Sequence, residues 1–186
     1  LQEKWSEYTC VSMEDDCNDR LQIVPIANRF ERSLAVSKND YFVFTAWWTA
    51  HCTFDAYQRQ EKAGGLLPNV FTYFIQDYEP GFYAWSSRYL MADATYRSKY
   101  KQIAIFNTEL LHEFMKNLGY NFYKEISFEP TLNSTLLSYY NKYKGTKIQK
   151  KKQILLYGRP GTQRNAFELI VLSLRKWIWM QEDAKE

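Results

Sequence analysis

The chain has 186 residues, of which 46% are hydrophobic and 24% charged, a composition typical of a folded domain with its own core and not of a disordered segment. Its net charge of +3 is too small to indicate a nucleic-acid-binding protein, because phosphate recognition normally needs a dense basic stripe. No apolar stretch approaches the roughly 20 residues of a membrane span, so we expect no transmembrane segment.

Aromatic side chains are the unusual feature of the composition. The chain has 15 Tyr, 12 Phe and 6 Trp, which together make up 18% of its residues. Such a surplus is typical of a bulky core, of a protein interface, or of platforms that bind sugar rings or bases. For any single aromatic residue, packing in the core is the first expectation.

The three cysteines, Cys10, Cys17 and Cys52, are an odd number without CxxC spacing. They indicate neither a disulfide framework nor a zinc site, and a reducing, cytoplasmic compartment fits them best. The chain begins without Met and stops directly after a helical pattern, so we expect it to be a section of a longer protein.

In chain order, apolar runs alternate with helical patterns. Short β-branched and aromatic runs predict strands at residues 21–26, 41–45, 69–76 and 102–106. The strand at 69–76 is almost continuously apolar, as expected for a strand covered on both faces. Helices are predicted at 46–65, after residue 81 and at 107–119, with Gly119 as a stop. This alternation predicts an α/β fold: a doubly wound, Rossmann-like parallel sheet with flanking helices.

The helix after residue 81 and the helix at 107–119 each have a predicted apolar face. In the first helix the apolar residues are spaced by four, three and four positions, and in the second they recur along one helical stripe. The first set is Trp85, Tyr89, Ala92 and Tyr96, and the second is Leu111, Phe114, Met115 and Leu118.

A second unit is predicted beyond a short helix at residues 131–143. The lysine-rich stretch that follows has no apolar face to dock with, so it is expected to be a solvated linker. A strand at 154–157, a turn at 158–163 and an apolar helix then restart the alternation. We therefore predict an N-terminal domain at 1–143 that lacks its first strand, a basic linker at 144–152, and the start of a second domain at 153–186.

Two carboxylates follow the predicted strand at 69–76. In open α/β sheets, ligands bind beyond the carboxyl ends of the strands. Asp77 and Glu79 could there orient sugar hydroxyls, act as a base, or bind a metal. Tyr78, Tyr83 and Trp85 lie beside them in the sequence and favour a binding site. The structural alternative is that one of the two carboxylates caps a helix starting near Phe82.

The loop at residues 158–165 has the elements of a phosphate-binding site. Gly158 and Gly161 would let the backbone approach a ligand closely, while Arg159 and Arg164 supply guanidinium groups. A helix beginning near Asn165 would direct its free amides at an anion. The pattern is neither GxGxxG nor a Walker motif, and the alternative is a turn with exposed arginines.

Other candidate residues are expected to be structural. His51 and His112 have no second ligand at metal spacing, so both are interpreted as ordinary helix residues. Trp47 and Trp48 follow a strand end, but packing in the core is the simpler expectation.

Three long stretches, in this order, resemble one family. They are TAWWTA, YFIQDYEPGFYAWSSRYLMADATYR and ILLYGRPGTQRNAFEL. Together they are similar to bacterial GT-B glycosyltransferases, in particular rhamnosyltransferases of the WsaF type, and the similarity extends over nearly the whole chain.

The resemblance implies two Rossmann-like domains that face each other across a cleft, and no obligatory metal or other cofactor. The acceptor saccharide would bind the N-terminal domain, and a nucleotide-diphosphate sugar, with dTDP-rhamnose as a candidate, would bind the C-terminal one. The donor diphosphate would be contacted by Gly158, Arg159, Arg164 and Asn165.

On the acceptor side, the resemblance implies that Asp77, Tyr78 and Glu79 line the cleft. From their place after the strand we expect Asp77 and Glu79 to be the catalytic residues, and we expect Tyr83 and Trp85 to lie with Tyr78 on the acceptor side of the cleft. The expected activity is transfer of a sugar in polysaccharide biosynthesis, in the cytoplasm or at the inner face of the membrane. The late acidic motif of such enzymes is missing from this sequence, so the 186 residues alone are expected to be inactive.

Two alternatives remain open at this point. One is a carbohydrate-binding or scaffolding fragment without catalysis, because half of a cleft cannot enclose both substrates. The other is a flavodoxin-like domain that binds a phosphate-containing ligand at its strand ends.

Overall fold

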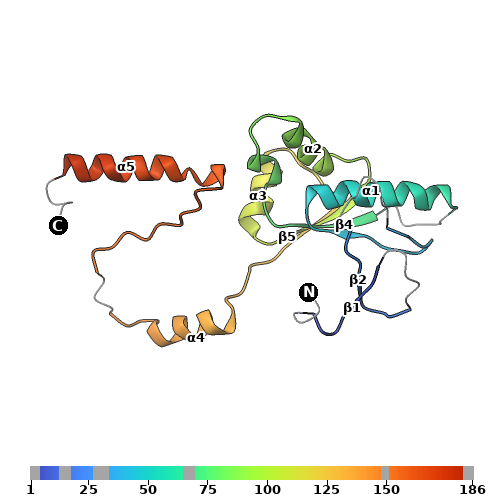
Figure 1. Ribbon diagram of the computed structural model, residues 1–186, viewed down its shortest axis with the longest axis horizontal. Helices are drawn as coiled ribbons and strands as arrows, with labels where there is room; N and C mark the ends of the chain where they lie inside the picture. The colour runs from blue at the N-terminus through green and yellow to red at the C-terminus, as the bar shows by residue number, and fades with distance from the viewer. Residues whose placement is uncertain (1–4, 13–17, 27–33, 65–69, 148–150, 182–186) are drawn as a thin grey trace.

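A parallel sheet forms the centre of the protein. The structure, a computed structural model, describes residues 5–12, 18–26, 34–64, 70–147 and 151–181. The sheet has four strands in the order β3–β4–β5–β6, and every neighbouring pair is parallel (Figure 1). Its strands are β3 (Val43–Phe44), β4 (Val70–Ile75), β5 (Lys101–Phe106) and β6 (Lys124–Ser127). This arrangement confirms the predicted α/β class with a Rossmann-like parallel sheet.

One helix connects each strand to the next. These helices are α1 (Trp47–Lys62), α2 (Ser87–Tyr96) and α3 (Glu109–Asn117), and a short 3-10 helix, η1 (Glu79–Phe82), precedes α2. Ser86 and Thr108 start α2 and α3 by accepting hydrogen bonds from backbone N–H groups three residues further on. Gly119 ends α3 with a φ of +80°, which glycine adopts without strain.

The core lies on one face of the sheet. Along β4 the residues alternate between buried and half-buried, and Phe71, Tyr73 and Ile75 are the buried ones. They pack in one cluster with buried side chains from all three helices, among them Tyr57 of α1, Tyr96 of α2 and Met115 of α3. The strands follow their order in the chain, so successive right-handed crossovers place their helices on the same face.

The expectations of a doubly wound sheet and of a strand β4 covered on both faces are therefore wrong for the described residues. Thr72 and Phe74 point to the other face and stay half-buried, and Phe74 contacts the ring of Phe128 with 5.9 Å between centroids. The sequence of β4 is almost continuously apolar although only one of its faces is fully buried. The other face also carries mostly apolar residues, but these are only half-buried.

A smaller sheet precedes the main one. It consists of β1 (Thr9–Cys10) and β2 (Gln22–Ile23), which pair in parallel. The strand predicted at 21–26 is therefore real but shorter. Cys10 and Cys52 are free and exposed, and Cys17, Gly65 and Asn69 lie outside the described residues.

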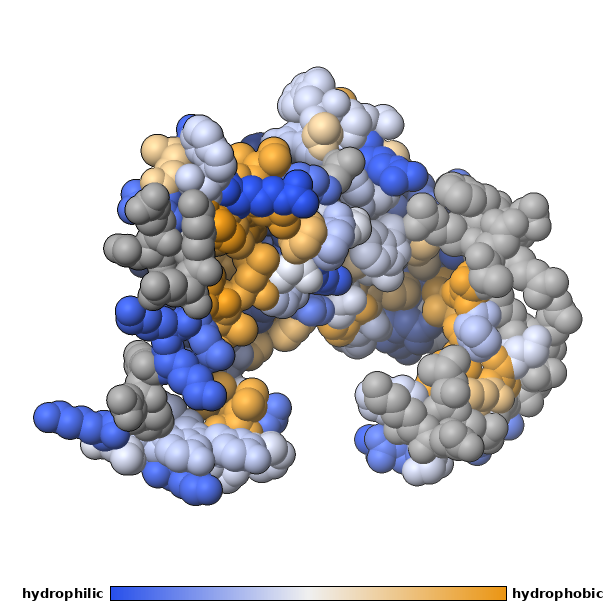
Figure 2. All heavy atoms as spheres, turned by 60° about the vertical axis from the view of Figure 1, so that its left-hand side comes forward, coloured by the Kyte–Doolittle hydropathy of each residue, from blue (hydrophilic) through white to orange (hydrophobic). Residues whose placement is uncertain are grey.

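Two helices follow β6 and stand apart from the sheet in Figure 1. They are α4 (Ser134–Tyr143) and α5 (Phe167–Met180), with a short 3-10 helix, η2 (Gln163–Asn165), between them. The structure describes all of α4 and α5, and neither buries a residue. Apolar side chains of α5 such as Leu169 and Trp179 are exposed, and Figure 2 shows broad orange areas at the surface.

The strand predicted at residues 154–157 is not formed. These residues belong to no strand, and Leu155 is 99% exposed. A strand needs a neighbour to pair with, and the described part of the second unit contains no other strand. The domain boundaries given above stay a prediction. Among the described residues, no helix has the length and apolar character needed to cross a membrane.

Candidate active site

A pocket of about 400 Å³ opens at the carboxyl edge of the main sheet. Its wall includes the residues that directly follow three strands: Thr45 after β3, Gln76 and Asp77 after β4, and Asn107 after β5. The side-chain amide of Asn107 donates to the carbonyl of Gln76 at 3.0 Å, which fixes two of these strand ends together. The pocket thus lies at the edge where open α/β sheets bind ligands.

Glu79 lies in the wall of this pocket and is itself buried. Its Oε2 atom accepts hydrogen bonds from the backbone N–H of Trp47 at 2.7 Å and from the hydroxyl of Tyr73 at 3.0 Å. Trp47 is the first residue of α1, and Ala46 before it has no side-chain acceptor with which to cap the helix. A carboxylate from 32 residues away therefore supplies the negative charge that a helix N-terminus favours.

Burial raises the pKa of the Glu79 carboxyl above its ordinary value. Hydrogen bonds from Trp47 and Tyr73 act in the opposite direction, and the nearby charge of Asp77 adds to the increase. The result is a carboxylate that takes up a proton more readily than a solvated one, at a position that faces the pocket.

Asp77 is the more open of the two carboxylates. Its Oδ1 accepts from the N–H of Tyr78 at 2.8 Å, and its Oδ2 lies 2.6 Å from the Nη1 of Arg164. The side chains of Asp77 and Arg164 are 48% and 37% exposed. Neither Asp77 nor Glu79 caps the helix after η1, because Ser86 does so, and the capping alternative is therefore wrong for that helix.

The loop at residues 158–165 contacts the rim of the pocket through Arg164. Its guanidinium carbon lies 3.9 Å from the ring centroid of Phe82, which lines the pocket, while Nη1 pairs with Asp77. This contact fixes η2 against η1 although the two segments are far apart in the chain. The positively charged guanidinium group of Arg164 thus lies directly beside a pocket lined by the carboxylates of Asp77 and Glu79.

The other residues of the loop lie outside this contact. Arg159 is exposed and donates to the hydroxyl of Tyr157 at 3.4 Å. At Gly158 an added Cβ would lie 3.0 Å from the ring of Phe167, so glycine leaves room there for that ring to pack closely against the loop. Asn165 is half-buried in η2, and α5 begins two residues later than the sequence predicted.

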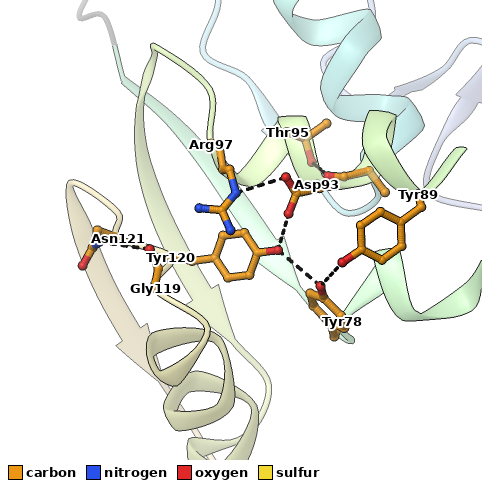
Figure 3. A network of polar contacts seen from close by, with 9 residues as sticks. Tyr78, Tyr89, Asp93, Thr95, Arg97, Gly119, Tyr120 and Asn121 are labelled. Atoms are coloured by element: carbon orange, nitrogen blue, oxygen red, sulfur yellow. Dashed lines mark hydrogen bonds and ion pairs between the residues drawn. The ribbon is translucent and has the colours of Figure 1, made fainter. Parts of the chain in front are cut away.

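The aromatic residues beside the carboxylates divide into two groups. The hydroxyl of Tyr83 accepts from the indole N–H of Trp47 at 3.1 Å, next to the first turn of α1. Tyr78 instead belongs to the hydrogen-bonded network of Figure 3, with Tyr89 and Tyr120. Trp85 precedes α2 and is 78% exposed, so it does not share the buried face of that helix as predicted.

The sequence reasoning missed several residues of the pocket wall. Asn107 and Thr45 could have been found by taking the first residue after every predicted strand, because parallel strands end at one edge. Trp48 also lines the pocket and is 42% exposed, whereas Trp47 is buried as expected. Phe82 carried no comparable signal, because its place depends on the 3-10 turn of η1.

Neither histidine lies in this pocket wall. His51 makes a hydrogen bond with the carbonyl of Met91 at 3.0 Å, and the Nε2 of His112 lies 2.7 Å from Glu125. Within the described ranges, no group of three His, Cys, Asp or Glu side chains is placed to hold a metal ion. The guanidinium of Arg164 is suited to an anionic ligand, whereas the carboxylates of Asp77 and Glu79 are not.

By its fold and site, the protein is a Rossmann-like α/β protein with a pocket at the carboxyl edge of its sheet and an arginine at the rim of that pocket. Two family descriptions match the chain, "WsaF, N-terminal domain" over residues 1–109 and "WsaF, C-terminal domain" over residues 152–186. The first match alone covers more than half of the chain, so the chain belongs to the WsaF family. The resemblance to WsaF-type proteins is thereby confirmed.

A curated relative is also similar. The O-antigen biosynthesis protein RfbC of Myxococcus xanthus is 30% identical over 158 residues. The similarity covers 85% of this chain but 11% of the relative's length.

Proposed function

We propose that this chain is part of a glycosyltransferase of polysaccharide biosynthesis. In this proposal a sugar, rhamnose as our specific candidate, moves from a nucleotide-diphosphate donor to a growing saccharide. Membership in the WsaF family and the similarity to an O-antigen biosynthesis protein support the general activity. The observation that carries it is the contact of Arg164 with Asp77, because it brings the loop at residues 158–165, which we propose to bind the donor diphosphate, to the rim of a carboxylate-lined pocket.

The proposed reaction joins the acceptor to the anomeric carbon of the donor sugar. A hydroxyl oxygen of the acceptor forms the new bond to that carbon, and the bond from the carbon to the diphosphate oxygen breaks. The diphosphate leaves with the electron pair, and the hydroxyl proton passes to a carboxylate. Negative charge therefore grows on the diphosphate, where a guanidinium fork stabilises the transition state most effectively.

The two carboxylates would take different roles in this reaction. Glu79 is the stronger candidate for the base, because its raised pKa makes it the better proton acceptor and it faces the pocket. Asp77 would hold Arg164 at the rim until the donor diphosphate takes over that guanidinium. Arg159, Gly158 and Asn165 would complete the diphosphate contacts when the donor is present.

The wider arrangement belongs to the same proposal. Residues 153–186 would open the second Rossmann-like domain of a GT-B enzyme, with the donor between the two domains. The protein would act in the cytoplasm or at the inner face of the membrane, close to its saccharide acceptor. The 186 residues alone would be inactive, because catalysis requires both substrates to be held in reacting geometry.

The test is donor turnover by the full-length protein. The purified protein would be offered dTDP-rhamnose and a panel of other nucleotide-diphosphate sugars, and the nucleotide product would be measured with and without a rhamnose oligosaccharide as acceptor. We expect one donor to be consumed faster when the acceptor is present. Absence of turnover and of binding for every donor in the panel would contradict the proposal.

A further inference from the structure

Trp85 offers an aromatic face to solvent outside the pocket. It is 78% exposed, and its ring lies 5.1 Å from that of Tyr89 at an angle of 42°. Ser86, the next residue, caps α2 by accepting from the N–H of Tyr89, so the backbone between the two rings is held. The two rings therefore form an ordered aromatic surface at the start of α2.

A chain of hydrogen bonds runs inward from Tyr89 (Figure 3). The hydroxyls of Tyr89 and Tyr78 lie 3.1 Å apart, and those of Tyr78 and Tyr120 lie 3.3 Å apart. Tyr120 donates to the Oδ1 of Asp93, whose Oδ2 pairs with Arg97 at 3.0 Å. The guanidinium of Arg97 also lies 4.3 Å from the centre of the Tyr120 ring.

The carboxylate at the inner end sets the direction of this chain. A carboxylate only accepts hydrogen bonds, so the single proton of Tyr120 goes to Asp93. The oxygen of Tyr120 must then accept from Tyr78, and the oxygen of Tyr78 must accept from Tyr89. Tyr89 therefore donates its proton to Tyr78, and the lone pairs of the Tyr89 oxygen stay available to accept from a ligand. The raised pKa of the Tyr89 hydroxyl, caused first by its bond to Tyr78, agrees with this direction.

We propose that Trp85 and Tyr89 form a saccharide-binding subsite for the acceptor. The apolar face of a sugar ring would lie on Trp85, and a hydroxyl of the same sugar would donate to the Oη of Tyr89. A saccharide fits this pair because it carries both an apolar ring face and hydroxyl donors, whereas an apolar protein segment would offer no donor to the lone pairs of the tyrosine oxygen.

The subsite would hold sugar units next to the reacting one. Phe82 lines the pocket, and Trp85 follows it by three residues, which keeps their Cα atoms within about 11 Å. An acceptor with several sugar units could therefore reach from the pocket to Trp85. This inference rests on the proposed function for the identity of the acceptor, but not for the binding itself.

The experiment compares binding and transfer with acceptors of increasing length. Affinities of the full-length protein for rhamnose oligosaccharides of one to six units, and for glucose oligosaccharides of the same lengths, would be measured by calorimetry. Transfer from dTDP-rhamnose would be measured with the same acceptors. The variants are Trp85→Ala and Tyr89→Phe, and Tyr89→Phe keeps the ring in place. Matched controls are Trp179→Ala on α5 and Tyr139→Phe on α4, two exposed aromatic residues outside the proposed subsite.

We expect Trp85→Ala to weaken binding of the longer oligosaccharides by about tenfold or more. Loss of one hydrogen bond in Tyr89→Phe is expected to weaken it about two- to tenfold. Neither change should affect the affinity for a single sugar, and the two control variants should bind as the wild type does.

The outcomes separate this inference from the proposed function. Unchanged affinity for every length in both variants, with normal transfer, would overturn the subsite and leave the transferase intact. Length-dependent binding that is lost in Trp85→Ala, without any donor turnover, would support the subsite and contradict the transferase. Loss of a protein partner in Trp85→Ala, with unchanged saccharide binding, would also overturn the subsite.

Discussion

Arg164 and Asp77 are 87 positions apart in the chain, yet their side chains lie 2.6 Å from each other at the rim of the pocket. Both side chains are more than a third exposed, so solvent screens the pair and its contribution to stability is small. Its importance is positional: it places the guanidinium of Arg164, a residue of the loop proposed to bind the donor diphosphate, at the rim of a carboxylate-lined pocket.

Replacement of Arg164 by Ala in the full-length protein should reduce both donor affinity and turnover. A charge-assisted contact that strengthens as the diphosphate leaves corresponds to a loss of about ten- to hundredfold. Arg164→Lys should restore little of it, because an ammonium group cannot replace a fork that reaches a carboxylate and stacks on Phe82. Calorimetry with the donor and a transfer assay would measure the two effects.

Arg159 and Lys151 supply the comparison for this prediction. Arg159→Ala should have a smaller effect than Arg164→Ala, because Arg159 contacts Tyr157 and not the pocket rim. Lys151→Ala, in the exposed basic segment, should leave both quantities unchanged. The assignment of the arginines would be wrong if Lys151→Ala lost donor binding while both arginine variants kept it.

A double-mutant cycle should show that the Arg164–Asp77 pair contributes little to folding. We expect a coupling free energy of no more than about 1 kcal/mol between Asp77→Asn and Arg164→Ala in denaturant unfolding. The physical reason is the exposure of both side chains, at 48% and 37%. A coupling of several kcal/mol would mean that this contact is a structural bridge and not an adaptable ligand-binding contact.

Glu79→Gln should separate the proposed catalytic role from the helix-capping role. The amide oxygen can still accept from Trp47 and Tyr73, so α1 should keep its start. Turnover should nevertheless fall about 10²- to 10⁴-fold, because the amide cannot take the acceptor proton. Wild-type turnover in a variant that has lost its carboxylate would exclude Glu79 as the base.

The same variant should change how stability depends on pH. The pKa of Glu79 is raised in the folded protein, so the folded state binds its proton more tightly than the unfolded state does. The stability from this group is present below the unfolded value of 4.5 and is lost as the pH rises through the folded value. Unfolding measured across this range should show a flatter slope in Glu79→Gln.

The sequence predicted most of the main sheet because its elements are specified locally. β4 and β5 are short apolar runs, and Ser86, Thr108 and Gly119 provide recognisable helix boundaries. The parallel order followed from the alternation of strands and helices. The prediction of a strand at residues 154–157 was wrong because a strand forms only beside a neighbouring strand, and the local sequence pattern does not show whether one is present.

The candidate site was predictable only in part. The carboxylates after β4 could be found because a parallel sheet presents its strand ends at one edge. The bond from Trp47 to Glu79 could not, because it joins a helix start without a side-chain cap to a residue 32 positions away. The exposure of Trp85 was also missed, because helical spacing was applied across Ser86, where the helix has not yet begun.

The pair of His112 and Glu125 should make the protein lose stability in acid. Glu125 lies in β6, with its Oε2 2.7 Å from the Nε2 of His112 in α3, and its side chain is 25% exposed. Burial alone would raise the pKa of Glu125, but the hydrogen bonds from His112 and from the N–H of Phe122 outweigh it and lower the pKa. A lowered folded pKa means that this group's stability is present above its unfolded value of 4.5 and is lost as the pH falls through the folded value.

Glu125→Gln should therefore flatten the decrease of unfolding free energy below about pH 5 and lower the stability at neutral pH. Glu113→Gln is the matched control, since Glu113 is an exposed glutamate of the helix that carries His112. Denaturant unfolding from pH 3 to pH 7 would compare the three proteins. Equal slopes for wild type and Glu125→Gln would show that the contact between α3 and β6 does not depend on this charge, and that the acid sensitivity has to be sought in other carboxylates.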